Sequence, residues 1–133
     1  YKDKLSKIDE EFSLFINNLN EDRRYLVSCE GAFSYLTSDY GMKEVYLWPV
    51  NAESQITPNR MARTISIVKN KNIPTVFCES TVSDESQMVV VRETGAKFGG
   101  ALFVDSLSVD GGPASTYIKM LEHNLHLIKK GLY

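Results

Sequence analysis

Hydrophobic positions recur at two different spacings along the chain, and the spacing changes near Tyr25. Before that residue, apolar side chains stand three or four positions apart with Lys and Glu between them, which predicts an amphipathic helix ending near Asn20. The members of this apolar stripe are Leu5, Ile8, Phe12, Phe15, Ile16 and Leu19. After Tyr25, short apolar runs alternate with longer helical stretches, which is typical of βα units.

This alternation predicts the fold class and the division of the chain into a leading helix and a βα lobe. The strands are expected over residues 25–30, 44–50, 75–79 and 101–105, and the helices over 31–40, 58–71, 84–93 and from 113 toward 132. Because crossovers between parallel strands are right-handed, the helices should cover both faces. We therefore predict an α/β fold: a four-stranded parallel sheet with helices on both faces, preceded by an amphipathic helix. The leading helix takes residues 1–24 and the βα lobe residues 25–133.

Several helix ends are marked by capping residues. Thr57 followed by Pro58 predicts a helix start, because the hydroxyl accepts a free N–H and proline at the first turn lacks an N–H that would have no partner. Gly41 and Gly95 are expected to end helices in the left-handed conformation, and Ser83 is expected to begin one.

Three of the predicted strands end on a carboxylate, namely Glu30, Glu79 and Asp105. Ligands of open parallel sheets bind beyond the carboxyl ends of the strands, so these acids are candidate ligands of a cation. Carboxylate oxygens suit manganese, magnesium or calcium, and with imidazole also zinc or iron. The alternative is that each acid only caps the following helix.

The neighbouring residues separate the three acids. Glu79 precedes Ser80 and Thr81, a run that can use a carboxylate to order a turn, so it is predicted to have a supporting or structural role. Cys29 and Cys78 each stand one residue before a strand-end acid and should face the other side of the sheet. With only these two cysteines there is no disulfide framework, and both are interpreted as buried free thiols.

Other polar and aromatic residues are interpreted as structural. His123 and His126 stand three apart on the last helix, but no third donor accompanies them, so they are not assigned to a metal site. Trp48, Tyr46 and Tyr40 are expected to pack.

Composition narrows the function classes. The 133 residues are 43% hydrophobic and 24% charged, with a net charge of −2, which disfavours nucleic-acid binding. The sequence has no apolar stretch of about 20 residues and no signal-peptide-like run at its start, and we expect it to be cut from something longer. Nucleotide-binding glycine loops and the GxSxG elbow are also missing.

The order of several short segments resembles a known family. They are SCEGAFSYLTSDY from Ser28, YLWPVNAESQITP, VFCESTVS, LFVDSLS and the closing TYIKMLEHNLHLIKKGL. Together they resemble the C-terminal lobe of the metal-binding solute-binding proteins of ABC importers, called cluster 9 or TroA-like, from about Ser28 to Leu132.

The resemblance implies a two-lobed receptor, not an enzyme, that holds one Mn²⁺ or Zn²⁺ ion between its lobes and delivers it to an ABC permease. It implies that Glu30 and Asp105 are the ligands from this lobe, and glutamate at the first position favours manganese over zinc. The N-terminal lobe, which would supply two histidines, has no counterpart here, and neither His123 nor His126 matches them. Periplasmic or outer-surface localisation is implied in the same way.

Two carboxylates alone do not satisfy a first-row ion, so the isolated lobe is predicted to bind metal weakly or not at all. One alternative is a Mg²⁺-dependent phosphoryl-transfer or hydrolytic enzyme that uses Glu30, Glu79 and Asp105 as its metal cage. Another is a structural domain whose acids cap helices.

Overall fold

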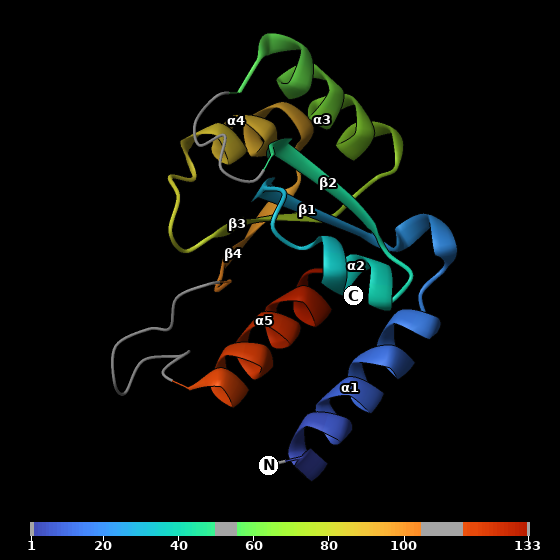
Figure 1. Cartoon of the computed structure of the whole chain (residues 1–133). Coiled ribbons are helices and arrows are strands. Elements are labelled where there is room, and N and C mark those ends of the chain that lie inside the picture. Colours follow the sequence, from blue (N-terminus) through green and yellow to red (C-terminus); the bar gives the residue numbers. More distant parts are fainter. Residues whose placement is uncertain (1, 50–55, 105–115, 133) are drawn as a thin grey trace.

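The computed structural model describes residues 2–49, 56–104 and 116–132 (Figure 1). Helices and strands alternate along this part of the chain, which confirms the predicted βα pattern. In order they are α1 (Lys2–Asn17), a short 3-10 helix (Glu21–Arg23), β1 (Tyr25–Glu30), α2 (Ser34–Asp39), β2 (Lys43–Trp48), α3 (Pro58–Asn70), β3 (Thr75–Glu79), α4 (Glu85–Thr94), β4 (Lys97–Leu102) and α5 (Tyr117–Leu132). None of the described helices is both long enough and apolar enough to cross a membrane.

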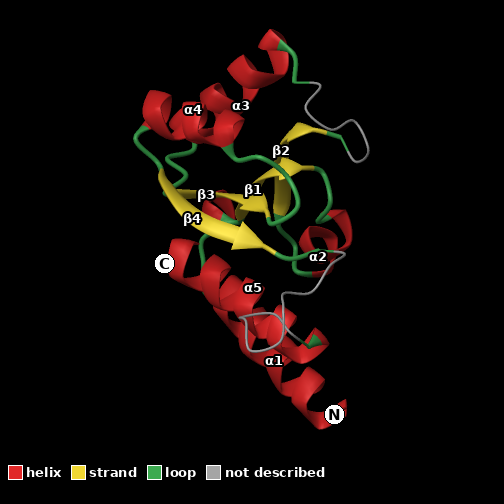
Figure 2. Ribbon diagram, turned by 90° about the vertical axis from the view of Figure 1, so that its left-hand side faces the viewer, coloured by secondary structure: helices red, strands yellow, loops and turns green. Residues whose placement is uncertain are grey.

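The strands form a middle layer with helices on both sides, as predicted (Figures 1 and 2). Alternate side chains of β1 and β3 enter two separate cores. The upper core joins the strands to α3 and α4 and includes Val27, Cys29, Val68, Val76, Cys78 and Val90. The lower core joins the strands to α1 and α5 and includes Phe12, Ile16, Leu26, Phe77, Leu102, Ile128 and Leu132.

The strand pairing differs from the prediction. Parallel ladders join β1 to β2 and β3 to β4, so the described strands form two two-stranded sheets rather than one four-stranded sheet. β1 and β3, which belong to different sheets, nevertheless lie side by side (Figure 2). The polar groups along this junction are engaged by side chains: the Glu30 N–H donates to the Glu79 carboxylate, and the Phe77 carbonyl accepts from Gln87 at 2.6 Å.

The predicted capping residues are confirmed at three helix ends. The Thr57 hydroxyl accepts the N–H of Arg60 at 3.2 Å and caps α3. Gly41 and Gly95 have φ values of 67° and 79°, in the left-handed region that glycine adopts without a steric penalty. The fourth predicted cap, Ser83, lies one residue before the N-cap of α4, which is Asp84; the Ser83 hydroxyl still accepts the N–H of Glu85 at 3.3 Å.

The last strand lies earlier in the chain than predicted. It runs over Lys97–Leu102 instead of residues 101–105. Two glycines obscure the strand pattern here, yet Gly99 fits this position because a Cβ atom there would come within 2.3 Å of the Phe77 ring. The predicted strand end at residue 105 is therefore wrong, because β4 ends at Leu102 and residues 103 and 104 are not in a strand; Asp105 itself lies outside the described residues.

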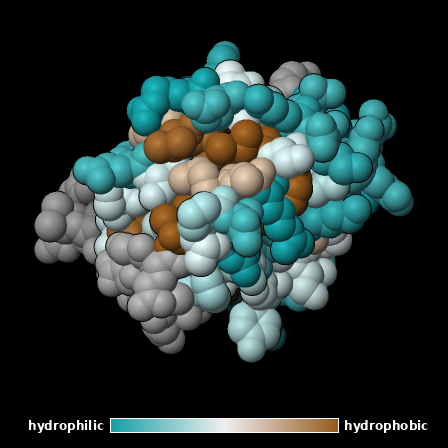
Figure 3. Space-filling view, turned by 90° about the horizontal axis from the view of Figure 1, so that it is seen from above, coloured by the Kyte–Doolittle hydropathy of each residue, from teal (hydrophilic) through white to brown (hydrophobic). Residues whose placement is uncertain are grey.

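Helices α3 and α4 cover the upper face. Viewed from above, the surface is mostly hydrophilic around a central strip of hydrophobic side chains (Figure 3). Met61 and Ile65 of α3 and Val91 of α4 are partly buried and pack against the upper core. These helices are therefore amphipathic.

Helix α1 packs on the lower face beside α5. The Tyr40 hydroxyl donates to Asp9 of α1 at 2.6 Å, and the Arg24 guanidinium, just before β1, donates to the Leu19 carbonyl after α1 at 3.1 and 2.9 Å. Burial raises the pKa of the Tyr40 hydroxyl, and the hydrogen bond to Asp9 raises it further. The leading helix thus shares a core with α5.

Candidate metal site at the strand ends

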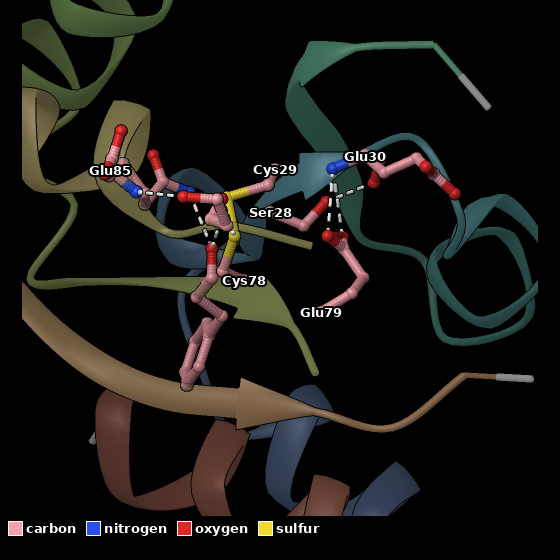
Figure 4. The surroundings of a disulfide bond; sticks show 9 residues. Ser28, Cys29, Glu30, Cys78, Glu79 and Glu85 are labelled. Atoms are coloured by element: carbon pink, nitrogen blue, oxygen red, sulfur yellow. Dashed lines mark hydrogen bonds between the residues drawn. A yellow bond between two sulfur atoms is a disulfide. The ribbon is translucent and has the colours of Figure 1, made fainter. Parts of the chain in front are cut away.

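Glu30 is the last residue of β1 and is half-buried. The backbone turns directly after it, because Gly31 donates to the Trp48 carbonyl at 3.0 Å and Ala32 donates to the Glu30 carbonyl at 2.8 Å. The Glu30 carboxylate is directed away from the carboxylate of Glu79 (Figure 4). The position at a strand end is the one predicted.

Gly31 allows the turn to approach β2. A Cβ atom at this position would lie 3.1 Å from the ring of Tyr46, which is tighter than ordinary van der Waals contact. The Arg60 guanidinium lies above the same ring, 4.7 Å from its centroid, in a cation–π arrangement. The glycine after Glu30 therefore has a packing reason, the close approach of the Tyr46 ring.

Glu44 of β2 holds the segment that follows Glu30. Its carboxylate accepts the N–H of Phe33 at 2.9 Å and the hydroxyl of Ser34 at 2.8 Å, at the first turn of α2. This contact also explains why α2 begins at Ser34 and not at Gly31 as predicted. Glu44 could not be identified from the sequence, because no local pattern connects it to residues about ten positions away.

Glu79 lies at the end of β3, is only 3% exposed, and accepts the backbone N–H of Glu30 through both oxygens, at 3.1 and 3.0 Å (Figure 4). Burial raises the pKa of Glu79 to about 7, against the lowering effect of the hydrogen bonds from the backbone N–H groups of Glu30 and of Glu79 itself. The nearby charge of Glu30 contributes to the increase. Glu79 thus contacts the Glu30 backbone, whereas the Glu30 carboxylate is directed elsewhere.

The interpretation of the two cysteines as free thiols is wrong. Cys29 and Cys78 form a disulfide bond between β1 and β3, with Cα atoms 4.9 Å apart. Strand alternation does place them in the upper core, as expected. The sequence could not reveal this pairing, because the partners are 49 residues apart and face each other only after β1 and β3 pack side by side.

The disulfide also decides what the cysteines can bind. In the described residues, the one group of three or more His, Cys, Asp or Glu whose donor atoms lie within 4.8 Å of one another consists of Cys29, Cys78 and Glu79. Since the two sulfur atoms are bonded to each other, they are not thiolates and lack the charge that makes cysteine a strong metal ligand. This buried cluster is therefore structural in its oxidised form.

The second predicted ligand, Asp105, lies outside the described residues. The backbone that leads to it is held by α5. Asn124 accepts the Phe103 N–H at 2.9 Å and donates to the Phe103 carbonyl at 2.7 Å. His123 places its Nε2 atom 3.1 Å from the Ala101 carbonyl, and its ring is edge-on to Phe103 at 5.3 Å.

A parallel βα lobe with a carboxylate at the end of its first strand fits the class of two-lobed substrate-binding proteins that the sequence segments resemble. The family comparison agrees. The model described as "ZnuA: Zinc-uptake complex component A periplasmic" matches residues 1–131, and the chain belongs to this family. The resemblance inferred from the sequence segments is thereby confirmed.

Individual relatives carry several different metals in their names. The chain is 46% identical over 131 residues to the iron-binding protein YfeA of Yersinia pestis, an alignment that covers 98% of this chain and 42% of YfeA. It is 32% identical over 132 residues to the manganese ABC transporter substrate-binding lipoprotein PsaA of Streptococcus mitis, covering 99% and 43%. The chain thus spans less than half the length of these curated relatives.

Solved structures show the same lobe. A mutant of the Mn-bound periplasmic metal binding protein from Candidatus Liberibacter asiaticus superposes with a TM-score of 0.92 at 37% identity, covering all of this chain and 49% of that one. The periplasmic zinc binding protein TroA from Treponema pallidum superposes with a TM-score of 0.88 at 26% identity, covering 99% and 50%. Both structures are about twice as long as this chain.

Proposed function

We propose that this chain is the C-terminal lobe of the receptor of a transition-metal ABC importer, and that Glu30 and Asp105 supply two carboxylate ligands to the transported ion. The observation that carries the proposal is the placement of Glu30 at the end of β1, with its carboxylate directed away from Glu79, in a chain of the ZnuA family. Manganese or zinc suits a site that combines these oxygens with imidazole from the other lobe. The iron in the name of YfeA adds Fe²⁺ as a third candidate.

The complete receptor completes the site with two histidines from its N-terminal lobe, and α1 follows the helix that joins the lobes. The receptor acts outside the cytoplasm, in the periplasm or on the outer surface, and passes the ion to a membrane permease. The relatives above are named for metal binding and transport, which favours a receptor over the Mg²⁺-dependent enzyme.

Calorimetry on the complete receptor tests the ligand assignment. Mn²⁺ and Zn²⁺ are titrated separately into the wild type and the Glu30→Ala and Asp105→Ala variants, and each variant is expected to weaken binding strongly. Glu93→Ala, which removes an exposed carboxylate of α4, is the matched control and should bind like the wild type. Unchanged affinity in both ligand variants would refute the assignment.

The isolated 133-residue chain gives a second test. Since two carboxylates leave most of the coordination sphere to water, it should bind either ion weakly or not at all. Tight, stoichiometric binding to the isolated chain that survives both substitutions would contradict the proposal.

A further inference from the structure

Asn124 of α5 fixes the chain just beyond the end of β4. It is 4% exposed, and its single amide group pairs with both backbone groups of Phe103, accepting the N–H at 2.9 Å and donating to the carbonyl at 2.7 Å. Asn and Gln carry a donor and an acceptor on one planar amide, as the backbone does, so they can imitate an adjacent β-strand. Asn124 therefore takes the place of a strand partner where the described ladder has ended.

This pairing lies close to a proposed ligand. Phe103 precedes Asp105 by two residues, and Ala101, two residues earlier still, is contacted by His123 from the same helix. Helix α5 thus holds the backbone at alternate positions as it approaches Asp105. A buried amide would not be needed merely to cover an apolar surface, because burying its polar groups costs free energy unless both are paired.

Glu79 holds the backbone of the other proposed ligand, Glu30. Both of its oxygens accept the backbone N–H of Glu30, and its exposed fraction is 3%. Because Gly31 donates to β2, strand alternation directs the Glu30 N–H toward β3, where Glu79 receives it. A neutral acceptor could make this bond with a smaller desolvation cost than a buried carboxylate.

We infer that Glu79 and Asn124 are positioning residues for metal binding: Glu79 holds the backbone at Glu30, and Asn124 holds the backbone two residues before Asp105. The inference rests on the proposed function. Groups that orient metal ligands lower the ordering cost of binding, and their loss typically weakens metal affinity about 10–100-fold.

The first test compares affinity with stability in the complete receptor. Asn124→Leu and Glu79→Leu remove the hydrogen bonds at similar side-chain size, and each should weaken Mn²⁺ binding by about tenfold or more in calorimetry. Glu79→Gln keeps one acceptor oxygen for the Glu30 N–H and should retain most of the affinity. Asn124→Asp keeps the acceptor but loses the donor, and should lie between Asn124→Leu and the wild type.

Thr75→Val is the matched control. It removes a buried hydrogen bond between β3 and α5, from the Thr75 hydroxyl to the Gly131 carbonyl at 2.8 Å, at the end of β3 opposite to Glu79. It should lower the melting temperature of the metal-free receptor and leave Mn²⁺ affinity unchanged. Equal losses of affinity in Thr75→Val and Asn124→Leu would overturn the inference, as would unchanged affinity in Asn124→Leu and Glu79→Leu.

A double-mutant cycle identifies which ligand each residue acts through. The effects of Asn124→Leu and Asp105→Asn on affinity should be less than additive, whereas those of Asn124→Leu and Glu30→Gln should add. Glu79→Leu should show the opposite pattern. Additivity in all four pairs would mean that the residues do not act through these ligands.

The same measurements test the inference separately from the proposed function. If Glu30→Gln and Asp105→Asn weaken binding but the Glu79 and Asn124 variants do not, the inference fails and the proposed function stands. If the two ligand variants bind like the wild type, the ligand assignment fails and the inference fails with it.

Discussion

Cys29 and Cys78 are joined by a disulfide bond across the junction between β1 and β3, where the described strands form no ladder. The bond lies in the upper core, and each cysteine directly precedes a strand-end glutamate. The covalent link therefore connects the two strands one residue before Glu30 and Glu79.

Removing this bond should destabilise the chain. The cysteines are 49 residues apart, and closing a loop of that length in the unfolded chain is worth about 2–4 kcal/mol. We expect Cys29→Ala combined with Cys78→Ala to lower the free energy of unfolding by this amount in urea, followed by the fluorescence of the single buried Trp48. Wild-type protein under a dithiol reductant should show a comparable loss. Two reactive thiols in the denatured, unreduced wild type would refute the disulfide.

The buried carboxylate of Glu79 should make the stability of the metal-free chain depend on pH. Its pKa is about 7 in the folded chain against an ordinary value of 4.5, so between these values the folded state binds more protons than the unfolded state. The free energy of unfolding should therefore fall as pH rises from 4.5 to 7, by about 1–3 kcal/mol from this group. In Glu79→Gln, which cannot ionise, the fall over the same range should be smaller. An identical pH profile in the two proteins would argue against a raised pKa.

Gly131 should not tolerate alanine although it lies in a helix. In an exposed helix interior this change stabilises by about 1 kcal/mol, but here the new Cβ atom would lie 2.8 Å from the Phe77 ring and 2.9 Å from Thr75 Cγ2. We expect Gly131→Ala to lower the free energy of unfolding by about 1–3 kcal/mol, as overpacking does. Adding Thr75→Ser removes the methyl group and keeps the hydroxyl, so it should offset part of the loss. A more stable Gly131→Ala chain would show that α5 and β3 are not this close.

Thr57→Ala should weaken the start of α3. It removes the hydroxyl that accepts the Arg60 N–H at 3.2 Å, at a cost of about 1 kcal/mol. Thr57→Ser keeps the acceptor and should remain close to the wild type in the same urea titration. Equal stability of the alanine and serine variants would mean that the cap contributes nothing.

Local signals in the sequence were the reliable ones. Thr57, Gly41 and Gly95 were identified correctly because a cap depends on the residue itself and on neighbours within one turn. The βα alternation was also correct, since it follows from the spacing of apolar residues. The start of β4 was not predicted correctly. Gly99 weakens the strand pattern, and the reason for a glycine at this position, the close approach of the Phe77 ring, lies outside the segment.

The sequence by itself determined the α/β class, the helices on both faces, the family, and the position of Glu30 at the end of the first strand. Only the tertiary structure decided that β1 and β3 meet through a disulfide and the Glu79 side chain, and that Asn124 pairs with Phe103. The physical reason is range: periodicity and capping are properties of a few consecutive residues, whereas these contacts join residues 21 to 49 positions apart that become neighbours only when the two cores close.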